Sequence, residues 1–163
     1  MELQIREAQL EKARDADGVV DVLDSYASDP VGGGARLAAE VRERIVPALR
    51  EHPAALVLLA LADDRAAGLL IGFYGLSTFQ ARPLLNVHDL AVVPEHRGSG
   101  VGRALLTEAE RHAVGRSCCK LTLEVQDGNK PARSLYQRFG FTDFVLGDTG
   151  PTRFLTKPLR NGP

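Results

Sequence analysis

The segment from residue 84 to residue 114 constrains the fold of this chain more than any other part. It starts with an apolar run, Leu84–Val93, which is closed by Pro94. The glycine-rich turn Arg97-Gly98-Ser99-Gly100-Val101-Gly102 follows, and a helical pattern runs on to about Val114. A strand, a turn and a helix in this order aim several backbone N–H groups at one point, where the helix N-terminus adds a partial positive charge. Glycines let the backbone approach an anion closely. We therefore expect a phosphate-bearing ligand at this turn.

The rest of the chain carries both strand and helix patterns. Apolar spacing predicts strands near residues 3–5 and over residues 56–62, 67–79, 84–93 and 120–125, helices over residues 16–27, 35–50, 100–114 and 131–139, and a closing hairpin of residues 141–145 and 153–156. We expect Asp15 or Asp17 to cap the first helix, and Pro47 to end or kink the second. This order of elements predicts an α/β sandwich with a mixed sheet rather than a doubly wound parallel sheet.

The composition is that of a soluble globular protein and disfavours several classes of function. The net charge is −1 and the basic residues are scattered, which argues against nucleic-acid binding. The longest apolar run, residues 54–62, is far shorter than the ~20 residues that cross a membrane, and residues 1–4 open no apolar signal segment. A disulfide between the adjacent Cys118 and Cys119 would be strained. We therefore expect these thiols to be reduced and buried as small apolar side chains, in a cytoplasmic protein.

Two common phosphate-binding motifs do not fit the glycine-rich turn. A dinucleotide-binding unit has its glycine turn after the first strand and an acidic residue ~20 residues later, and Glu124 is too isolated to serve. A nucleotide P-loop ends in Gly-Lys-Ser/Thr, whereas this chain has Gly102-Arg103-Ala104. We also expect no metal, because the cysteines and histidines do not have the spacing of zinc ligands.

Two blocks of the sequence together indicate a family. In the segment from His88 to Leu106, the residues Arg97, Gly100 and Gly102 match the pattern Arg/Gln-x-x-Gly-x-Gly/Ala. The second block consists of Asn129, Pro131-Ala132, Leu135-Tyr136 and Phe139-Gly140-Phe141. In this order and separation the blocks resemble those of the GNAT N-acetyltransferase superfamily. The resemblance implies one GNAT-like domain over residues 1–163, with a mostly antiparallel sheet of about six to seven strands, splayed at its centre and flanked by about four helices.

The resemblance implies acetyl-CoA as the cosubstrate. Its pyrophosphate would lie in the glycine-rich turn, with Arg103 adding charge nearby. Its peptide-like arm would lie against the backbone of residues 90–92, as an added strand does, and Asn129 would meet that arm or a bound water. The expected acetyl-CoA contacts are Leu90, Ala91, Val92, Arg97, Gly98, Ser99, Gly100, Val101, Gly102, Arg103, Asn129 and Ala132.

Acetyl transfer to an amine needs a base for the ammonium proton and an acid for the leaving thiolate. The family places its proton-donating tyrosine at Tyr136; without the motif this residue would be taken for a core aromatic. His88 and Asp89 are candidates for the base, on one strand where alternation predicts opposite faces. They could equally be a hydrogen-bonded pair without a catalytic role. Glu124 is a further candidate, and a chain of waters could replace all three.

The acceptor is the least constrained part of the expected function. In this family the regions that correspond to residues 26–39 and 77–86 shape the acceptor site, and the Gly32-Gly33-Gly34 run is either a lid or a plain connector. A small-molecule amine is the favoured acceptor, with a protein N-terminus or a lysine as the alternative. A non-catalytic acetyl-CoA-binding module is the rival function, and a homodimer is possible. The acidic residues that could attract a cation are Asp24, Asp29, Glu40 and Asp89.

Overall fold

The computed structural model describes residues 2–159. These fall into two compact units, and the boundary along the chain lies between Leu123 and Glu124. The first unit holds a five-stranded sheet and three helices, and the second holds one helix and an extended segment. None of the helices within residues 2–159 is long and apolar enough to cross a membrane.

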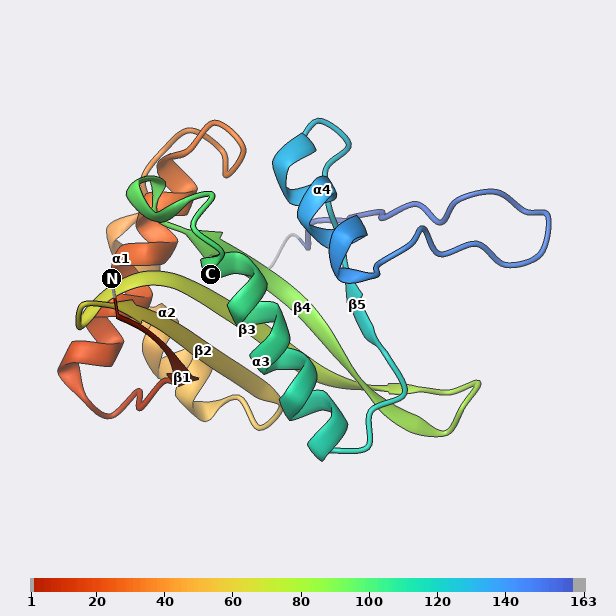
Figure 1. Cartoon of the computed structure of the whole chain (residues 1–163), viewed down its shortest axis with the longest axis horizontal. Helices are drawn as coiled ribbons and strands as arrows, with labels where there is room; N and C mark the ends of the chain where they lie inside the picture. Colours follow the sequence, from red (N-terminus) through yellow and green to blue (C-terminus); the bar gives the residue numbers. More distant parts are fainter. Residues whose placement is uncertain (1, 160–163) are drawn as a thin grey trace. The chain divides into compact units, whose positions relative to one another are not determined.

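The sheet of the first unit has the strand order β1-β2-β3-β4-β5 (Figure 1). The strands are β1 (Leu3–Glu7), β2 (Ala55–Ala62), β3 (Arg65–Ser77), β4 (Arg82–Val92) and β5 (Leu121–Leu123). Neighbouring strands are antiparallel from β1 to β4, whereas β4 and β5 are parallel. The expected mixed, mostly antiparallel sheet is therefore confirmed.

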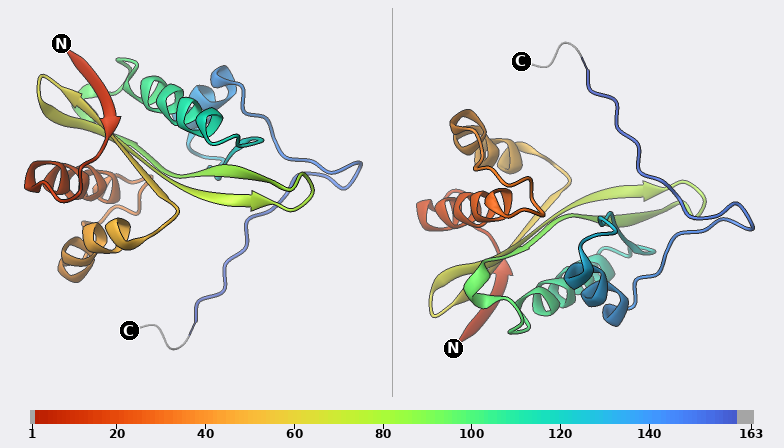
Figure 2. Two further views of the ribbon diagram at one scale, coloured as in Figure 1. Left: turned by 90° about the horizontal axis from the view of Figure 1, so that it is seen from below. Right: turned by 90° about the horizontal axis from the view of Figure 1, so that it is seen from above.

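Helices cover both faces of this sheet. They are α1 (Ala13–Ser28), α2 (Ala39–Glu51) and α3 (Val101–Gly115), and a 3₁₀ turn, η1 (Pro94–His96), precedes α3. Figure 2 shows α1 and α2 on one face and α3 on the other. Because strand residues alternate between faces, odd-numbered residues of β3 such as Leu69 and Ile71 pack under α1 and α2. Gly68, which precedes Leu69, faces α3.

A two-residue turn joins β2 to β3. Asp63 and Asp64 both have positive φ, +46° and +70°, as a type I′ hairpin turn requires, and Ala62 pairs with Arg65. Aspartate tolerates this left-handed conformation better than most residues. The turn therefore lies between two of the expected strands, and Arg65 is already the first residue of β3.

Gly68 on β3 lets α3 lie very close to the sheet. A Cβ at this position would stand 2.9 Å from Cγ1 of Val101 and 3.0 Å from the carbonyl oxygen of Ala91. Val101 is the first residue of α3, and Ala91 is near the end of β4. The missing side chain at Gly68 therefore fixes where the N-terminus of α3 meets the end of β4.

β4 carries one residue more than its partner strand. Ile71 pairs with Asp89 but Gly72 pairs with Val87, so His88 is the extra residue of a β-bulge. Bulges locally redirect side chains and are enriched next to active sites. The alternation of faces along β4 is therefore interrupted at His88.

Two details of the helices, and the burial of the cysteines, differ from the sequence-based expectations. Lys12 is the N-cap of α1 without a side-chain cap, and Asp15 lies inside the first turn. There Asp15 is buried, paired with Arg6 at 2.5 Å, and accepts the Gln9 N–H at 2.7 Å. Asp15 is therefore not a cap, because it is already satisfied by β1 and the β1–α1 loop. Pro47 does not end α2, which continues to Glu51. Cys118 and Cys119 are free thiols, but they are only half-buried.

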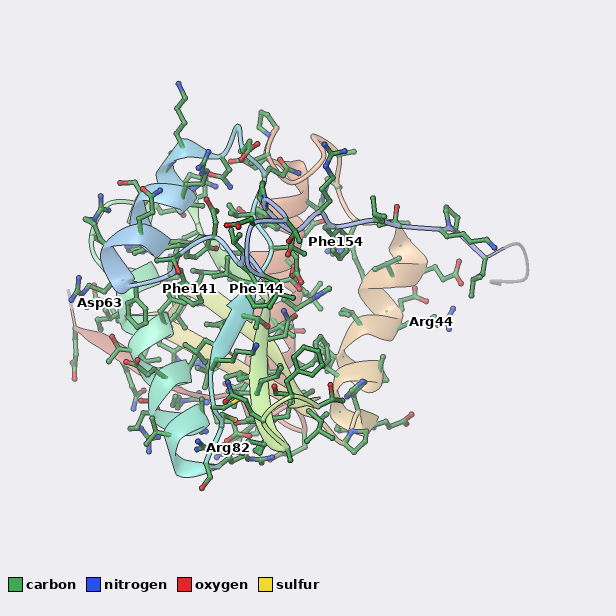
Figure 3. All side chains as sticks on the ribbon, turned by 90° about the vertical axis from the view of Figure 1, so that its right-hand side faces the viewer. Arg44, Asp63, Arg82, Phe141, Phe144 and Phe154 are labelled. Carbon is green, nitrogen blue, oxygen red and sulfur yellow. The ribbon has the colours of Figure 1, made fainter. Side chains whose placement is uncertain are left out.

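The second unit contains α4 (Lys130–Phe139), and the chain continues as an extended segment. The expected closing hairpin is wrong for the described residues, where a single bridge joins Val145 to Pro151. Proline has no N–H to extend a ladder, and Gly147 and Gly150 have positive φ. Figure 3 labels Phe144 and Phe154, which are 56 % and 72 % exposed, so the apolar face that would stabilise such a hairpin is not covered. Residues 2–159 therefore contain five strands instead of six or seven, while four α-helices agree with the expectation.

We predict that Gly68→Ala lowers the free energy of unfolding by about 1–3 kcal/mol, because the new methyl group overpacks the contact with Val101 and Ala91. Chemical denaturation of both proteins would measure the difference. Gly115→Ala is the matched control, since a Cβ there meets nothing within 4 Å and Gly115 lies in α3. This control should be neutral or slightly stabilising. Equal stability of Gly68→Ala and wild type would contradict the close approach.

Candidate functional site

The glycine-rich turn forms the start of α3. Gly98 and Gly100 have φ of +76° and +92°, a left-handed conformation in which a side chain is strained. Gly100 is the N-cap of α3, and no side chain of the described residues caps this helix end. The Ser99 hydroxyl donates to the His96 carbonyl oxygen at 2.6 Å. The first N–H groups of α3 have no partner inside the helix, so the turn leaves them available to an anion.

The strand before the turn has an open edge. β4 pairs with β3 as far as Val92, but it pairs with β5 only over Leu85–Val87. Beyond Val87, no strand within residues 2–159 lies on that side of β4. On the β3 side, the Val93 N–H donates to the carbonyl oxygen of Ala67 at 3.0 Å. By alternation, the backbone N–H groups of Leu90 and Val92 point toward the open edge, where an extended ligand can pair with them.

The side chain of Arg97 is held by protein groups on both sides. Its Nε donates to the carbonyl oxygen of Val92 at 3.0 Å, and its Nη1 lies 2.8 Å from Oδ2 of Asp29. Asp29 follows α1 directly. The arginine that opens the family motif therefore connects the end of β4 to the loop after α1. Arg103, by contrast, is exposed on the first turn of α3.

His88 and Asp89 lie on the same face of the sheet, and the expectation of opposite faces is wrong. The His88 ring makes an edge contact with Phe73, with ring centroids 5.5 Å apart, and Phe73 packs against the core under α1 and α2. Asp89 pairs with Ile71, which belongs to the same core. The bulge at His88 inserts one residue, so two successive side chains turn to one face.

Asp89 is the acidic candidate that remains unneutralised. Asp24 pairs with Arg36, Asp29 with Arg97 and Glu40 with Arg44. In the part of the chain that the structure describes, no lysine or arginine forms an ion pair with Asp89. Burial raises the pKa of the Asp89 carboxyl, and the neighbouring His88 opposes part of this effect. A half-buried carboxylate of this kind can bind an ammonium group or accept its proton.

The remaining candidates belong to the second unit. Glu124 is exposed and comes directly after β5. Asn129 caps α4, where its Oδ1 accepts the Ala132 N–H at 3.2 Å, so both residues already have a structural role. Tyr136 is half-buried on α4 and its ring makes an edge contact with Phe141, with centroids 5.8 Å apart.

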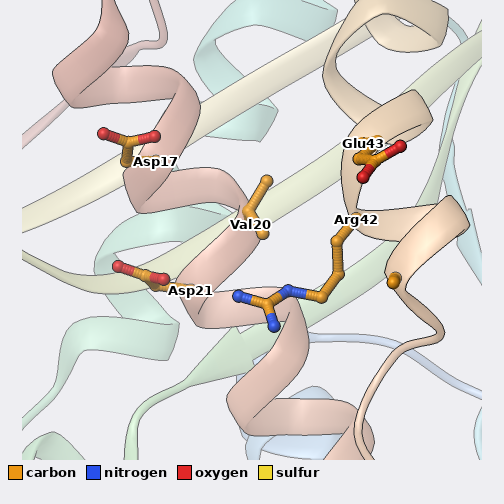
Figure 4. A pocket seen from close by; sticks show the side chains of 6 residues that line it. Asp17, Val20, Asp21, Arg42 and Glu43 are labelled. Atoms are coloured by element: carbon orange, nitrogen blue, oxygen red, sulfur yellow. The ribbon is translucent and has the colours of Figure 1, made fainter.

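A surface cavity lies away from the expected acetyl-CoA contacts and catalytic candidates. It lies between α1 and α2, has a volume of about 480 Å³, and is lined by Asp17, Val20, Asp21, Ala39, Arg42 and Glu43 (Figure 4). None of the expected acetyl-CoA contacts or of the acid and base candidates lines it, and Ala39 is the last residue of the region 26–39 expected to shape the acceptor site. Among the described residues, no group of three histidine, cysteine, aspartate or glutamate side chains is arranged to hold a metal ion.

The structure adds side chains near Asp89 that no motif singles out. Tyr26 of α1 has a raised pKa because it is buried and because Asp89 and Asp29 are close. His52 stacks at a tilt on Phe73, with ring centroids 4.8 Å apart, and so extends the aromatic contact of His88. Tyr26 and Phe73 look like ordinary core residues in the sequence, and only the folded sheet brings them to Asp89 and His88.

We predict that Asp89→Asn raises the free energy of unfolding at pH 7 by about 1 kcal/mol, because it removes a half-buried charge. The folded-state pKa of Asp89 is raised above 3.8, so wild type loses stability as the pH rises through the folded value. The two proteins should therefore become equally stable below about pH 4. Denaturation curves across this pH range would test it, and a less stable Asp89→Asn protein at pH 7 would contradict it.

Asp15→Asn is the matched control, for which we expect the opposite change: a lower free energy of unfolding at pH 7. Hydrogen bonds from Arg6 lower the pKa of Asp15, so this carboxylate stabilises the fold at neutral pH and the effect is lost as the pH falls through the lowered pKa. Breaking the buried pair should cost about 3 kcal/mol at pH 7.

Comparisons with known proteins find similar acetyltransferases. The chain is 41 % identical over 76 residues to a streptothricin acetyltransferase from Streptomyces lavendulae, a match that covers 47 % of this chain and 40 % of the relative. It is 34 % identical over 73 residues to the thialysine N-epsilon-acetyltransferase of Bos taurus, a match that covers 45 % of this chain and 42 % of the relative. The matches thus span about two fifths of the length of these relatives.

The fold and the family follow from two further comparisons. The crystal structure of a ribosomal-protein-alanine N-acetyltransferase from Brucella melitensis superposes with a TM-score of 0.69 at 23 % identity, over 90 % of this chain and 99 % of that one. At this identity the superposition establishes a common fold. The sequence profile of the acetyltransferase (GNAT) family, whose members generally use acetyl-CoA, matches residues 19–141. The chain therefore belongs to the GNAT family of acetyltransferases.

Proposed function

We propose that this chain transfers an acetyl group from acetyl-CoA to the primary amine of a small molecule, by direct attack of the amine. The observation that carries the proposal is the continuous path from the open edge of β4 into the uncapped N-terminus of α3. A peptide-like arm and a pyrophosphate, joined in one ligand, match these two features in the same order.

The donor would be held mainly by backbone groups. The Leu90 and Val92 N–H groups on the open edge would bind the pantetheine arm, and the amides from Gly98 to Arg103 would bind the phosphates. Positive φ at Gly98 and Gly100 supports this, because it shapes a turn without side chains between backbone and ligand. When bound, acetyl-CoA supplies the activated thioester. The exposed Arg103 would add charge near the phosphates.

Asp89 would bind the acceptor ammonium and take its proton. An alkylammonium with a pKa near ~10.4 is charged at neutral pH, so the amine must lose a proton before it attacks. Asp89 has no lysine or arginine partner among the described residues, and burial raises its pKa, which makes the carboxylate a stronger base. His88 on the same face would take the proton onward to solvent. Glu124 or a water chain are the alternative bases.

Tyr136 would protonate the leaving thiolate of coenzyme A. The assignment rests on its position in the family block Leu135-Tyr136 and on its half-burial on α4. Asn129 and Ala132 begin the same helix, and this end is secured by the Asn129 cap. The cap supports a role for Asn129 in orienting α4, in addition to the cofactor contact implied by the family.

The acceptor class is supported by the similar proteins. The two curated relatives are named for streptothricin and for the N-epsilon group of thialysine, and each is a small-molecule amine. A half-buried carboxylate at Asp89 suits a cationic acceptor of this type. A protein N-terminus or a lysine remains the alternative acceptor, and a non-catalytic acetyl-CoA-binding module remains the rival function.

The proposal is tested by measuring the release of free coenzyme A thiol with an amine panel. Streptothricin, thialysine, a peptide with a free N-terminus and a lysine-containing peptide would each be mixed with acetyl-CoA and the protein. We expect release with at least one of the small amines. Release with the peptides alone would show that the acceptor is an amine of a protein and not a small molecule. Tight binding of acetyl-CoA without release on any amine would identify a binding module and overturn the proposed activity.

We predict that Tyr136→Phe lowers kcat about 10²-fold or more, because it removes the proton donor for the thiolate. The dissociation constant for acetyl-CoA should change less than about twofold. Both are measured on purified protein with the best amine of the panel. Tyr74→Phe is the matched control: within the described residues, the buried Tyr74 hydroxyl has no hydrogen-bond partner, so removing it should leave kcat unchanged. Wild-type turnover of Tyr136→Phe would rule out the assigned acid.

A further inference from the structure

The loop after α1 is folded around one residue, Asp29. Asp29 accepts three N–H groups of the loop: its backbone carbonyl oxygen accepts from Gly32 at 2.8 Å and from Gly34 at 3.0 Å, and its Oδ1 accepts from Val31 at 3.0 Å. A Cβ at Gly32 would stand 1.9 Å from the carbonyl oxygen of Tyr26, so the turn packs directly on the end of α1. The glycine run is therefore part of a hydrogen-bonded turn that packs on the end of α1.

This turn is attached to the donor site by one ion pair. Oδ2 of Asp29 lies 2.8 Å from Nη1 of Arg97, and the two side chains are 15 % and 46 % exposed. The Val31 N–H and then Arg97 hold the pKa of the Asp29 carboxyl below its usual range, so this group is charged at neutral pH. Arg97 in turn is fixed to the end of β4 through the Val92 carbonyl oxygen. The guanidinium thus bridges the loop and the strand that leads into the glycine-rich turn.

The same loop adjoins the carboxylate that we assign to the acceptor. Tyr26, on the last turn of α1, is close enough to both Asp89 and Asp29 for each carboxylate to raise its pKa. Tyr26 also packs against the core under α1 and α2. The Asp29 backbone N–H donates to the Tyr26 carbonyl oxygen at 3.1 Å, so Asp29 joins Arg97 to the end of α1. There Tyr26 packs against the core that contains Ile71, the strand partner of Asp89.

We propose that Asp29 is a positioning residue for the acceptor amine: through Arg97 it fixes residues 29–34 and the end of α1 beside Asp89. The inference rests on the proposed acetyltransferase function. Asp29 itself touches neither substrate. Its effect is to make the wall of the amine site depend on an arginine of the donor site.

Hydrogen exchange of the loop amides tests the attachment without any turnover. Asp29→Asn removes the charge but keeps an oxygen that can accept the Val31 N–H, so it mainly weakens the contact with Arg97. Asp29→Asn and Arg97→Gln should each raise exchange over residues 29–36 about fivefold, and the double variant should not exceed the larger single effect. Unchanged exchange in Arg97→Gln would overturn the proposal.

Asp64→Asn is the matched control for exchange. It makes the same substitution in an aspartate–arginine pair, since Asp64 lies 3.1 Å from Arg14, but its side chain is 85 % exposed on the β2–β3 turn. Exchange over residues 29–36 should not change in this variant. A change there would show that loss of any surface ion pair loosens the loop, and the specific role of Asp29 would be lost.

Steady-state kinetics test the role in acceptor binding. With the best amine of the panel, Asp29→Asn should raise KM for the amine about fivefold, while kcat and the dissociation constant for coenzyme A stay within about twofold. A change in coenzyme A affinity with an unchanged amine KM would place Asp29 in donor binding and overturn the proposal. If wild type acetylates no amine, the proposed function fails, whereas the exchange result still decides whether Arg97 holds the loop.

Discussion

The candidate site depends on the way β4 changes partners. β4 stays paired with β3 to Val92 but leaves β5 after Val87, and one extra residue, His88, is inserted just past that point. The separation exposes the backbone edge of Leu90 and Val92, and the inserted residue turns Asp89 toward α1. Two features of β4, the open edge and the bulge, therefore give the surface proposed for an extended donor and the carboxylate proposed for an amine.

Charge is distributed unequally between the two parts of this site. The donor side offers mostly backbone N–H groups, which carry no net charge and need no counter-ion when empty. The acceptor side has several acidic residues, but Asp24, Asp29 and Glu40 are each matched by an arginine. These pairs leave Asp89 as the candidate carboxylate near β4 that has no lysine or arginine partner among the described residues. In the proposed function, recognition of a cationic amine therefore relies on one carboxylate whose burial lowers the stability of the fold at neutral pH.

Sequence reasoning succeeds where the determinants are local. The strand, glycine-rich turn and helix between residues 84 and 114 are encoded by neighbouring residues, and the structure reproduces them with shifts of one or two residues. The bulge at His88 is invisible because no residue type marks it, and alternation then assigns the wrong face to one of two neighbours. The pairing of Asp29 with Arg97 joins residues far apart in sequence, which no pattern predicts. The closing hairpin fails because its apolar residues have no covering layer.

The close contact at Gly68 has a consequence for how sequences of this family can be recombined. The first residue of α3, Val101, occupies the space that a side chain at Gly68 would fill. The two positions lie on different elements, so a crossover between them would separate residues that must fit together. A chimera that takes its glycine-rich turn and α3 from a relative should take β3 from the same parent. Otherwise the first residue of α3 and the residue at position 68 would not fit against each other. These two segments are therefore best exchanged as one block.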